Sequence, residues 1–144
     1  MLNRLQKRKI NLRLKNQRQQ RGGRGEEVAV SFLQGKGWKI VARNFYLPRG
    51  GEIDIIAWDK ETLVFVEVRS SEEQSRRVPL VETISATKVK ALQRSAFYYL
   101  QQHCPQAPCP PLRFDLITVE READSFFCRH YPNFIENCDF WENQ

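Results

Sequence analysis

The chain has 144 residues, of which 41% are hydrophobic and 11% aromatic, and its formal net charge is +6. This length and composition suit one globular domain with its own core. No apolar run is long enough to span a membrane, and the basic start lacks the apolar stretch and cleavage site of a secretory signal. A cytoplasmic protein without a membrane partner is therefore expected.

The positive charge is concentrated near the amino terminus. Residues 1–24 hold nine of the 23 Lys and Arg residues and no acid, which leaves 14 basic against 17 acidic residues in the remainder. Residues 1–22 are interpreted as a basic arm, partly disordered or helical, and residues 23–144 as one α/β domain. Basic arms commonly bind nucleic acid through its phosphates, although a merely solvated extension has the same composition.

Apolar periodicity predicts, in chain order, a helix, three strands, a longer helix and two further strands. The expected elements are a helix from Glu26 that ends at Gly35 and Gly37, strands at 38–47, 52–58 and 63–70, a helix from about Leu80 to Gln102, and strands at 111–120 and from Ser125, the last interrupted by Pro132. The order αβββαββ indicates an α/β fold in which helices flank a mixed central sheet. The four cysteines have no zinc-site spacing.

Carboxylates interrupt the strands expected at 52–58 and 63–70. Strict alternation of side chains puts Glu52, Asp54 and Ile56 on one face of the first strand and Ile53 and Ile55 on the other.

The sequence DKET between these two strands suits a hairpin turn, which would bring Asp54 close to Glu67. Two acids on one sheet face repel each other unless a cation lies between them. Their oxygens are also the ligands that Mg²⁺ prefers, so a metal site is the economical interpretation.

Two helical residues have alternative interpretations. Glu26 is tilted toward the body at the start of the first helix, where it could stabilise the helix dipole or, beside an acidic sheet face, supply a third carboxylate. Lys88 lies on the inner stripe of the second helix between Ile84 and Leu92. Its stem could simply cover apolar surface, or its ammonium could lean toward the metal site or a phosphate.

Polar residues elsewhere on the strands are less informative. Arg43 and Asn44, near the end of the first strand, could contact phosphate or shape the turn. Arg113 and Asp115 alternate along the strand at 111–120 and are interpreted as a cross-strand ion pair.

These motifs together resemble a known family. The sequences GEEVA, RNF, GEIDIIA, LVFVEVR and RFD, with a later helix that carries Lys88, resemble the YraN-like uncharacterised bacterial family from about Arg24 to Glu120. That family is similar to compact PD-(D/E)xK nucleases, including archaeal Holliday-junction resolvases. The resemblance implies a restriction-endonuclease-like fold, Mg²⁺ or Mn²⁺ as cofactor, DNA as the expected nucleic-acid partner and a possible homodimer.

The resemblance also assigns roles to residues. Asp54 matches the motif aspartate, Glu67 the acid of the (D/E)xK element, and Arg69 the lysine of that element. Glu26 resembles the helix glutamate that completes the acidic cluster, and the carbonyl of Val68 is a further expected metal ligand. Metal ligation is thus expected from Glu26, Asp54, Glu67 and Val68.

Catalytic roles are expected for Asp54, Glu67, Arg69 and Lys88, and phosphate contacts for Arg43, Asn44, Arg69 and Lys88. The departure from the family is Arg69, because members usually have Lys there. Arginine stabilises phosphate charge but cannot readily act as a base. The sequence thus leaves three hypotheses: a metal-dependent DNA endonuclease, a nucleic-acid-binding module with a degenerate nuclease site, and an interaction adaptor.

Overall fold

The computed structural model of the chain describes residues 6–10, 24–71 and 84–135. The elements in these ranges are β1 (Gln6–Ile10), α1 (Arg24–Gly35), β2 (Lys39–Leu47), β3 (Gly51–Asp59), β4 (Thr62–Ser71), α2 (Ala86–His103), β5 (Leu112–Glu122) and β6 (Ser125–Tyr131). From α1 onward, the expected order αβββαββ is confirmed. The expected start of the second helix, near Leu80, lies outside the described residues. No helix within the described ranges is long and apolar enough to cross a membrane.

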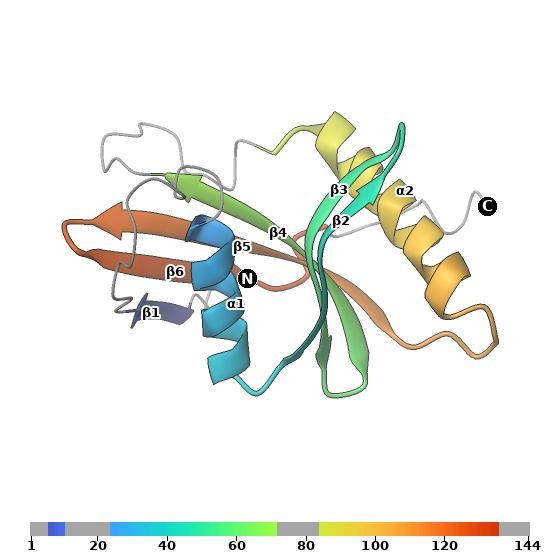
Figure 1. Cartoon of the computed structure of the whole chain (residues 1–144), viewed down its shortest axis with the longest axis horizontal. Coiled ribbons are helices and arrows are strands. Elements are labelled where there is room, and N and C mark those ends of the chain that lie inside the picture. Colours follow the sequence, from blue (N-terminus) through green and yellow to red (C-terminus); the bar gives the residue numbers. More distant parts are fainter. Residues whose placement is uncertain (1–5, 11–23, 72–83, 136–144) are drawn as a thin grey trace.

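The described strands form one mixed sheet in the order β1-β6-β5-β4-β3-β2 (Figure 1). Only the β4–β5 pair is parallel, and α2 lies on the connection between these two strands. The turn between β3 and β4 contains Lys60 at φ 55°, a left-handed conformation that suits a tight hairpin. The hairpin expected at DKET is therefore present.

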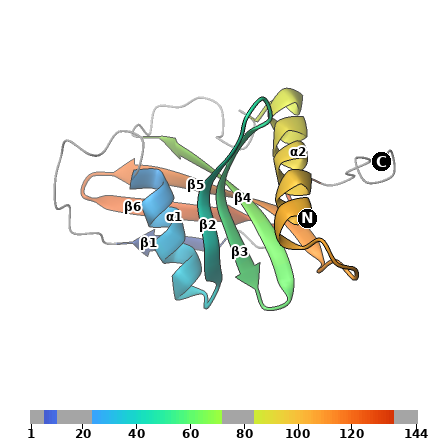
Figure 2. The same ribbon diagram turned by 45° about the vertical axis from the view of Figure 1, so that its right-hand side comes forward.

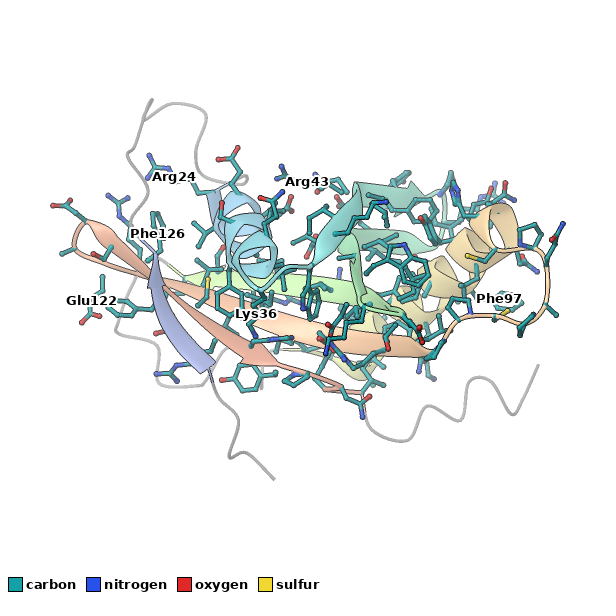
Figure 3. All side chains as sticks on the ribbon, turned by 90° about the horizontal axis from the view of Figure 1, so that it is seen from below. Arg24, Lys36, Arg43, Phe97, Glu122 and Phe126 are labelled. Atoms are coloured by element: carbon teal, nitrogen blue, oxygen red, sulfur yellow. The ribbon has the colours of Figure 1, made fainter. Side chains whose placement is uncertain are left out.

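Each helix packs on its own apolar cluster. The stripe of α1 (Val28, Ala29, Phe32 and Leu33) is buried in the cluster that holds Ile55 and Val66 of the sheet. Residues of α2, including Leu92 and Ala96, pack instead with Ile53 and Phe65. Figure 2 shows the β2–β3 hairpin passing between the two helices, and Figure 3 shows α1 over one face of the sheet.

The expected alternation along β3 is wrong at one point. Ile53 and Ile56 lie in the α2 cluster, whereas Ile55 lies in the α1 cluster, so the strand changes face between Ile53 and Ile55. The neighbouring strand β2 also changes face here. Its residue Asn44 has a φ of 50°, which is unusual within a strand. A local reversal of this kind rotates side chains that strict alternation would place on one face.

Part of the basic arm joins the sheet. Residues Gln6–Ile10, which the sequence suggested would be disordered or helical, form β1 and pair antiparallel with β6. An uncovered β6 edge offers a row of backbone donors and acceptors, and pairing with any extended segment satisfies them. Strand β6 ends at Tyr131, directly before Pro132, because proline has no N–H to donate to a neighbouring strand.

Candidate active site

Asp54 lies where β3 separates from β4. The ladder between these strands extends from Asp59↔Thr62 to Ile55↔Val66 and is not continued at Asp54. There the backbone N–H of Val68 donates instead to Oδ2 of Asp54 at 2.8 Å. The carboxylate thus replaces a strand partner, and this hydrogen bond fixes Asp54 beside the end of β4.

Glu67 is a buried acid with a second acid beside it. Only 3% of its surface is exposed. Burial raises the pKa of Glu67 to about 7, and the negative charge of Asp54 contributes to the rise, whereas Lys88 and Arg69 oppose it. The structure therefore brings Asp54 and Glu67 together, as the facing strands predicted, and charge repulsion between them is only partly compensated.

The two cations contact one oxygen of Glu67. Nε of Arg69 lies 3.4 Å and Nζ of Lys88 3.6 Å from Oε1. The other oxygen, Oε2, is buried and accepts no hydrogen bond from any described residue. Such an oxygen normally has a partner, since burying a polar atom without one costs about 1–3 kcal/mol.

The donor set fits a hard divalent cation. Two facing carboxylates, one with an unpartnered buried oxygen, supply the oxygen ligands that Mg²⁺ and Mn²⁺ prefer. Among the described residues no three Asp, Glu, His or Cys side chains gather closely enough to hold an ion by themselves. Mg²⁺ commonly uses one or two carboxylates and keeps several waters, so the pair suffices. Ligation by Glu26 and by the carbonyl of Val68 stays a prediction.

Glu26 reaches the edge of this site from α1. A Cβ added at Gly25 would lie 2.8 Å from Cβ of Ser70, so only glycine allows the start of α1 to pack this closely on β4. Burial and the charge of Asp54 raise the pKa of Glu26, whereas a hydrogen bond with the side chain of Asn44 lowers it. Glu26 is thus near enough to sense Asp54 electrostatically.

Lys88 is placed by the start of α2. Ser85 caps this helix, and its Oγ accepts a hydrogen bond from the N–H of Lys88 at 3.1 Å. The first turn therefore lies beside Glu67, and the ammonium of Lys88 reaches that carboxylate. Of the two interpretations of Lys88 from the sequence, the structure agrees with the second: the ammonium lies toward the acids, and the side chain is 30% exposed.

Arg43 and Asn44 lie on the other side of the acids, on β2. The side chain of Arg43 is exposed beside α1 in Figure 3 and favours the charged form of Glu26. Asn44 hydrogen-bonds Glu26, a role that the sequence did not reveal although Asn often adopts positive φ. Phosphate contact by either residue stays a prediction.

A second polar cluster, centred on Asp115 of β5, lies apart from these acids. Asp115 is fully buried, and its oxygens contact Nε and Nη2 of Arg113 at 2.8 and 3.0 Å and Nε2 of His130 at 2.7 Å. Arg113 also reaches Asp59 of β3 at 3.1 Å. The expected cross-strand pair of Arg113 and Asp115 is thus a pair within one strand, because residues two apart share a face.

The raised pKa of Glu67 predicts a stabilising substitution. Between its ordinary value of 4.5 and about 7 the folded protein binds this proton more tightly than the unfolded chain, so stability falls as pH rises through that range. Without metal, Glu67→Gln should raise the free energy of unfolding by about 1–3 kcal/mol at about pH 8 and by almost nothing below the ordinary pKa. Urea unfolding in EDTA measures this, and the same gain at both pH values would contradict it.

The fold and the site define a class of protein: a mixed α/β domain in which a buried acid, Glu67, faces a second acid, Asp54, where two central strands separate. Within that class, the chain belongs to the uncharacterised protein family UPF0102, whose family model matches residues 25–119. This confirms the YraN-like assignment.

Relatives match most of the chain. It is 38% identical over 119 residues to a UPF0102 protein of Carboxydothermus hydrogenoformans, covering 83% of this chain and 98% of the relative. It is 43% identical over 110 residues to one of Desulfosudis oleivorans, covering 76% and 86%. A relative in Chlorobium phaeobacteroides is 43% identical over 98 residues, covering 68% and 75%.

Proposed function

We propose that this protein is an Mg²⁺- or Mn²⁺-dependent endonuclease of the PD-(D/E)xK type that hydrolyses DNA phosphodiester bonds. The observation that carries the proposal is the pairing of Asp54 with the buried Glu67, whose Oε2 accepts no hydrogen bond from a described residue. When both acids are ionised, as above the raised pKa of Glu67, a pair without enough local positive charge is costly unless a cation joins it. If Asp54 and Glu67 served only the fold, the free-energy cost of two neighbouring acids would have no purpose.

The residues around the pair suit phosphate hydrolysis. Asp54 and Glu67 would hold a divalent cation, which when bound would supply Lewis-acid activation of water and neutralise phosphate charge. The guanidinium of Arg69 and the ammonium of Lys88, each about one-third exposed beside Glu67, would bind oxygens of the scissile phosphate. Among the described residues, the ion pairs of both cations are with Oε1 of Glu67, and each cation has further N–H donors that can reach a substrate.

Cleavage assays on the full chain test this proposal. Duplex, single-stranded and four-way-junction DNA, incubated with Mn²⁺, should be cut, and EDTA should stop the cutting. Absence of cleavage of all three DNA forms would contradict the nuclease proposal. The junction substrate also tests whether cuts come in symmetrical pairs, as a homodimer would make them.

One observation favours a second candidate, a binding module that no longer cuts. Arg69 occupies the position at which the nuclease motif has lysine, and a guanidinium, which stays protonated in proteins, cannot take a proton from water. Salt-sensitive DNA binding without cleavage would support this candidate.

Replacement of Arg69 by lysine separates the two candidates further. Lysine keeps the positive charge but restores an ammonium that can orient or deprotonate water, so Arg69→Lys should raise the cleavage rate roughly tenfold. DNA affinity in EDTA should change little, because the charge is kept. An unchanged rate in the lysine variant would argue against any catalytic limitation at position 69.

A further inference from the structure

The most exposed large hydrophobic side chain in the described part of the chain is the ring of Tyr46 on β2. Tyr46 is 67% exposed, whereas Tyr98, the next most exposed, is 40% exposed. Single exposed rings are common on protein surfaces. The position of this ring relative to the acid pair therefore decides what it can do.

Tyr46 points away from α2 and toward the side of Glu26. Phe45 packs in the α2 cluster, and successive side chains of a strand point to opposite faces, so Tyr46 points the other way. Its register partner on β3 is Glu52. The charge of Glu52 raises the pKa of Glu26, as the charge of Asp54 does. Tyr46 therefore lies beside a carboxylate that belongs to the surroundings of the candidate site.

The distance from this ring to the acid pair is short. Asp54 follows Glu52 by two positions on β3, which is about 7 Å at about 3.4 Å per residue. Stacked nucleotides are also about 3.4 Å apart along one strand. A base on the ring of Tyr46 would thus belong to a nucleotide within about two positions of a phosphate held at Asp54.

The backbone that carries Tyr46 is fixed against α2. The ring of Phe45 packs edge-on against that of Tyr99, with centroids 5.2 Å apart. At Gly51 an added Cβ would lie 3.1 Å from Cβ of Ala91, so the hairpin and the helix are in close contact. Figure 2 shows the end of the β2–β3 hairpin alongside α2. A ring on a rigid support loses little conformational freedom on binding, which favours affinity.

The charges around the ring suit a base better than a phosphate. The carboxylate of Glu52 repels phosphate but can accept hydrogen bonds from the amino groups of bases. Arg43, exposed on the same strand and close enough to favour the charged form of Glu26, offers a guanidinium for the phosphate. Bases within a duplex are already stacked on both sides. A protein ring therefore stacks on a base that has left the duplex.

From this placement we propose that the ring of Tyr46 stacks on an unpaired base next to the phosphate bound at the acid pair and so positions the DNA strand for cleavage. This inference rests on the proposed function and narrows its substrate class to DNA with an unpaired base close to the scissile bond, as in a single strand or a flap.

Binding measurements on the full chain in EDTA test the stacking without cleavage. Fluorescence anisotropy compares a labelled oligothymidylate with a duplex of the same length. Tyr46→Ala should bind the oligothymidylate at least about fivefold more weakly than the wild type and the duplex equally well, because only the unpaired base loses its stacking partner. Tyr46→Phe keeps the ring and should retain the wild-type affinity.

The matched control is Tyr98→Ala, which removes the same ring from the exposed side of α2. Its affinity for both DNA forms should equal that of the wild type. Because the rings of Tyr98 and Phe45 lie 6.2 Å apart, this control also reports whether loss of a ring disturbs β2. In Tyr46→Trp the added indole emission, taken as the difference from the wild type, should be quenched by oligothymidylate, as stacking on a base requires.

Several outcomes would overturn the proposal. These are equal losses in Tyr46→Ala and Tyr98→Ala, equal losses for oligothymidylate and duplex, and indole emission in Tyr46→Trp that saturating oligothymidylate leaves unchanged. A Tyr46→Ala variant that binds DNA normally but no longer self-associates would assign the ring to an interface between chains and would also overturn it. Ring-dependent binding without Mn²⁺-dependent cleavage would remove the nuclease proposal but keep the stacking. Cleavage that requires Asp54, with binding that ignores the ring, would remove only this inference.

Discussion

Asp54→Asn should abolish metal-dependent cleavage of DNA, with a loss of about 10³-fold or more in rate. The asparagine keeps the size of the side chain, and its oxygen can still accept from Val68, so the junction of β3 and β4 is preserved. What it removes is one of the two negative charges that the proposed metal site requires. Loss of about 4 kcal/mol of transition-state stabilisation corresponds to this factor.

The matched control is Asp124→Asn, which makes the same chemical change in the exposed turn between β5 and β6. Its cleavage rate should equal that of the wild type. Circular dichroism of both variants checks that the fold is kept. If both variants cut DNA at the wild-type rate, Asp54 has no part in catalysis and the proposed site is wrong.

Asp115→Asn should cause a large loss of stability, about 3–5 kcal/mol at about pH 7. Burial alone would raise the pKa of Asp115, but hydrogen bonds from His130, Arg113 and the N–H of Asn133 outweigh burial and lower it. The substitution leaves the guanidinium of Arg113 and the ring of His130 without their buried negative partner. Urea unfolding of the wild type and the variant measures the difference.

The pH dependence has a definite sign. A lowered pKa means that ionised Asp115 stabilises the folded state above its ordinary value of 3.8, and this contribution is lost as pH falls below that value. The difference between wild type and Asp115→Asn should therefore be constant near neutrality and shrink in acid. Cleavage per folded molecule should stay unchanged, because Asp115 lies outside the acid pair. A difference that grows in acid would contradict this account.

Much of the fold could be predicted from local pattern. The strands at 52–58 and 63–70 are short apolar runs joined by a tight turn, so their pairing, and with it the approach of Asp54 to Glu67, follows from hairpin geometry. The inward stripe of α1 likewise follows from helical spacing. These features depend on residues that are close in the sequence, so they can be predicted from the sequence of one chain.

Other features depend on contacts distant in sequence. The change of face at Asn44 and Ile53 allows the β2–β3 hairpin to pack with both helices, and no local pattern marks it. Gln6–Ile10 has the composition of a solvated arm and becomes a strand by pairing with β6. His130 contacts Asp115 across two strands whose register only the folded chain reveals.

The sequence predicts that the two acids of the site repel each other, but it does not predict how far the pKa of Glu67 is raised. Facing acids indicate repulsion, but a pKa of about 7 for Glu67 requires its nearly complete burial, which only the folded chain reveals. The contacts of Arg69 and Lys88 with a single oxygen likewise depend on where α2 begins.

Mn²⁺ binding to the metal-free full chain tests most directly whether Asp54 and Glu67 together hold a cation. Electron paramagnetic resonance of free Mn²⁺, titrated with protein at slightly alkaline pH, gives the affinity and stoichiometry. We expect one site per chain, weakened at least about tenfold in Asp54→Asn and in Glu67→Gln and unchanged in Asp124→Asn. Wild-type affinity in both acid-pair variants would contradict a metal site between these carboxylates.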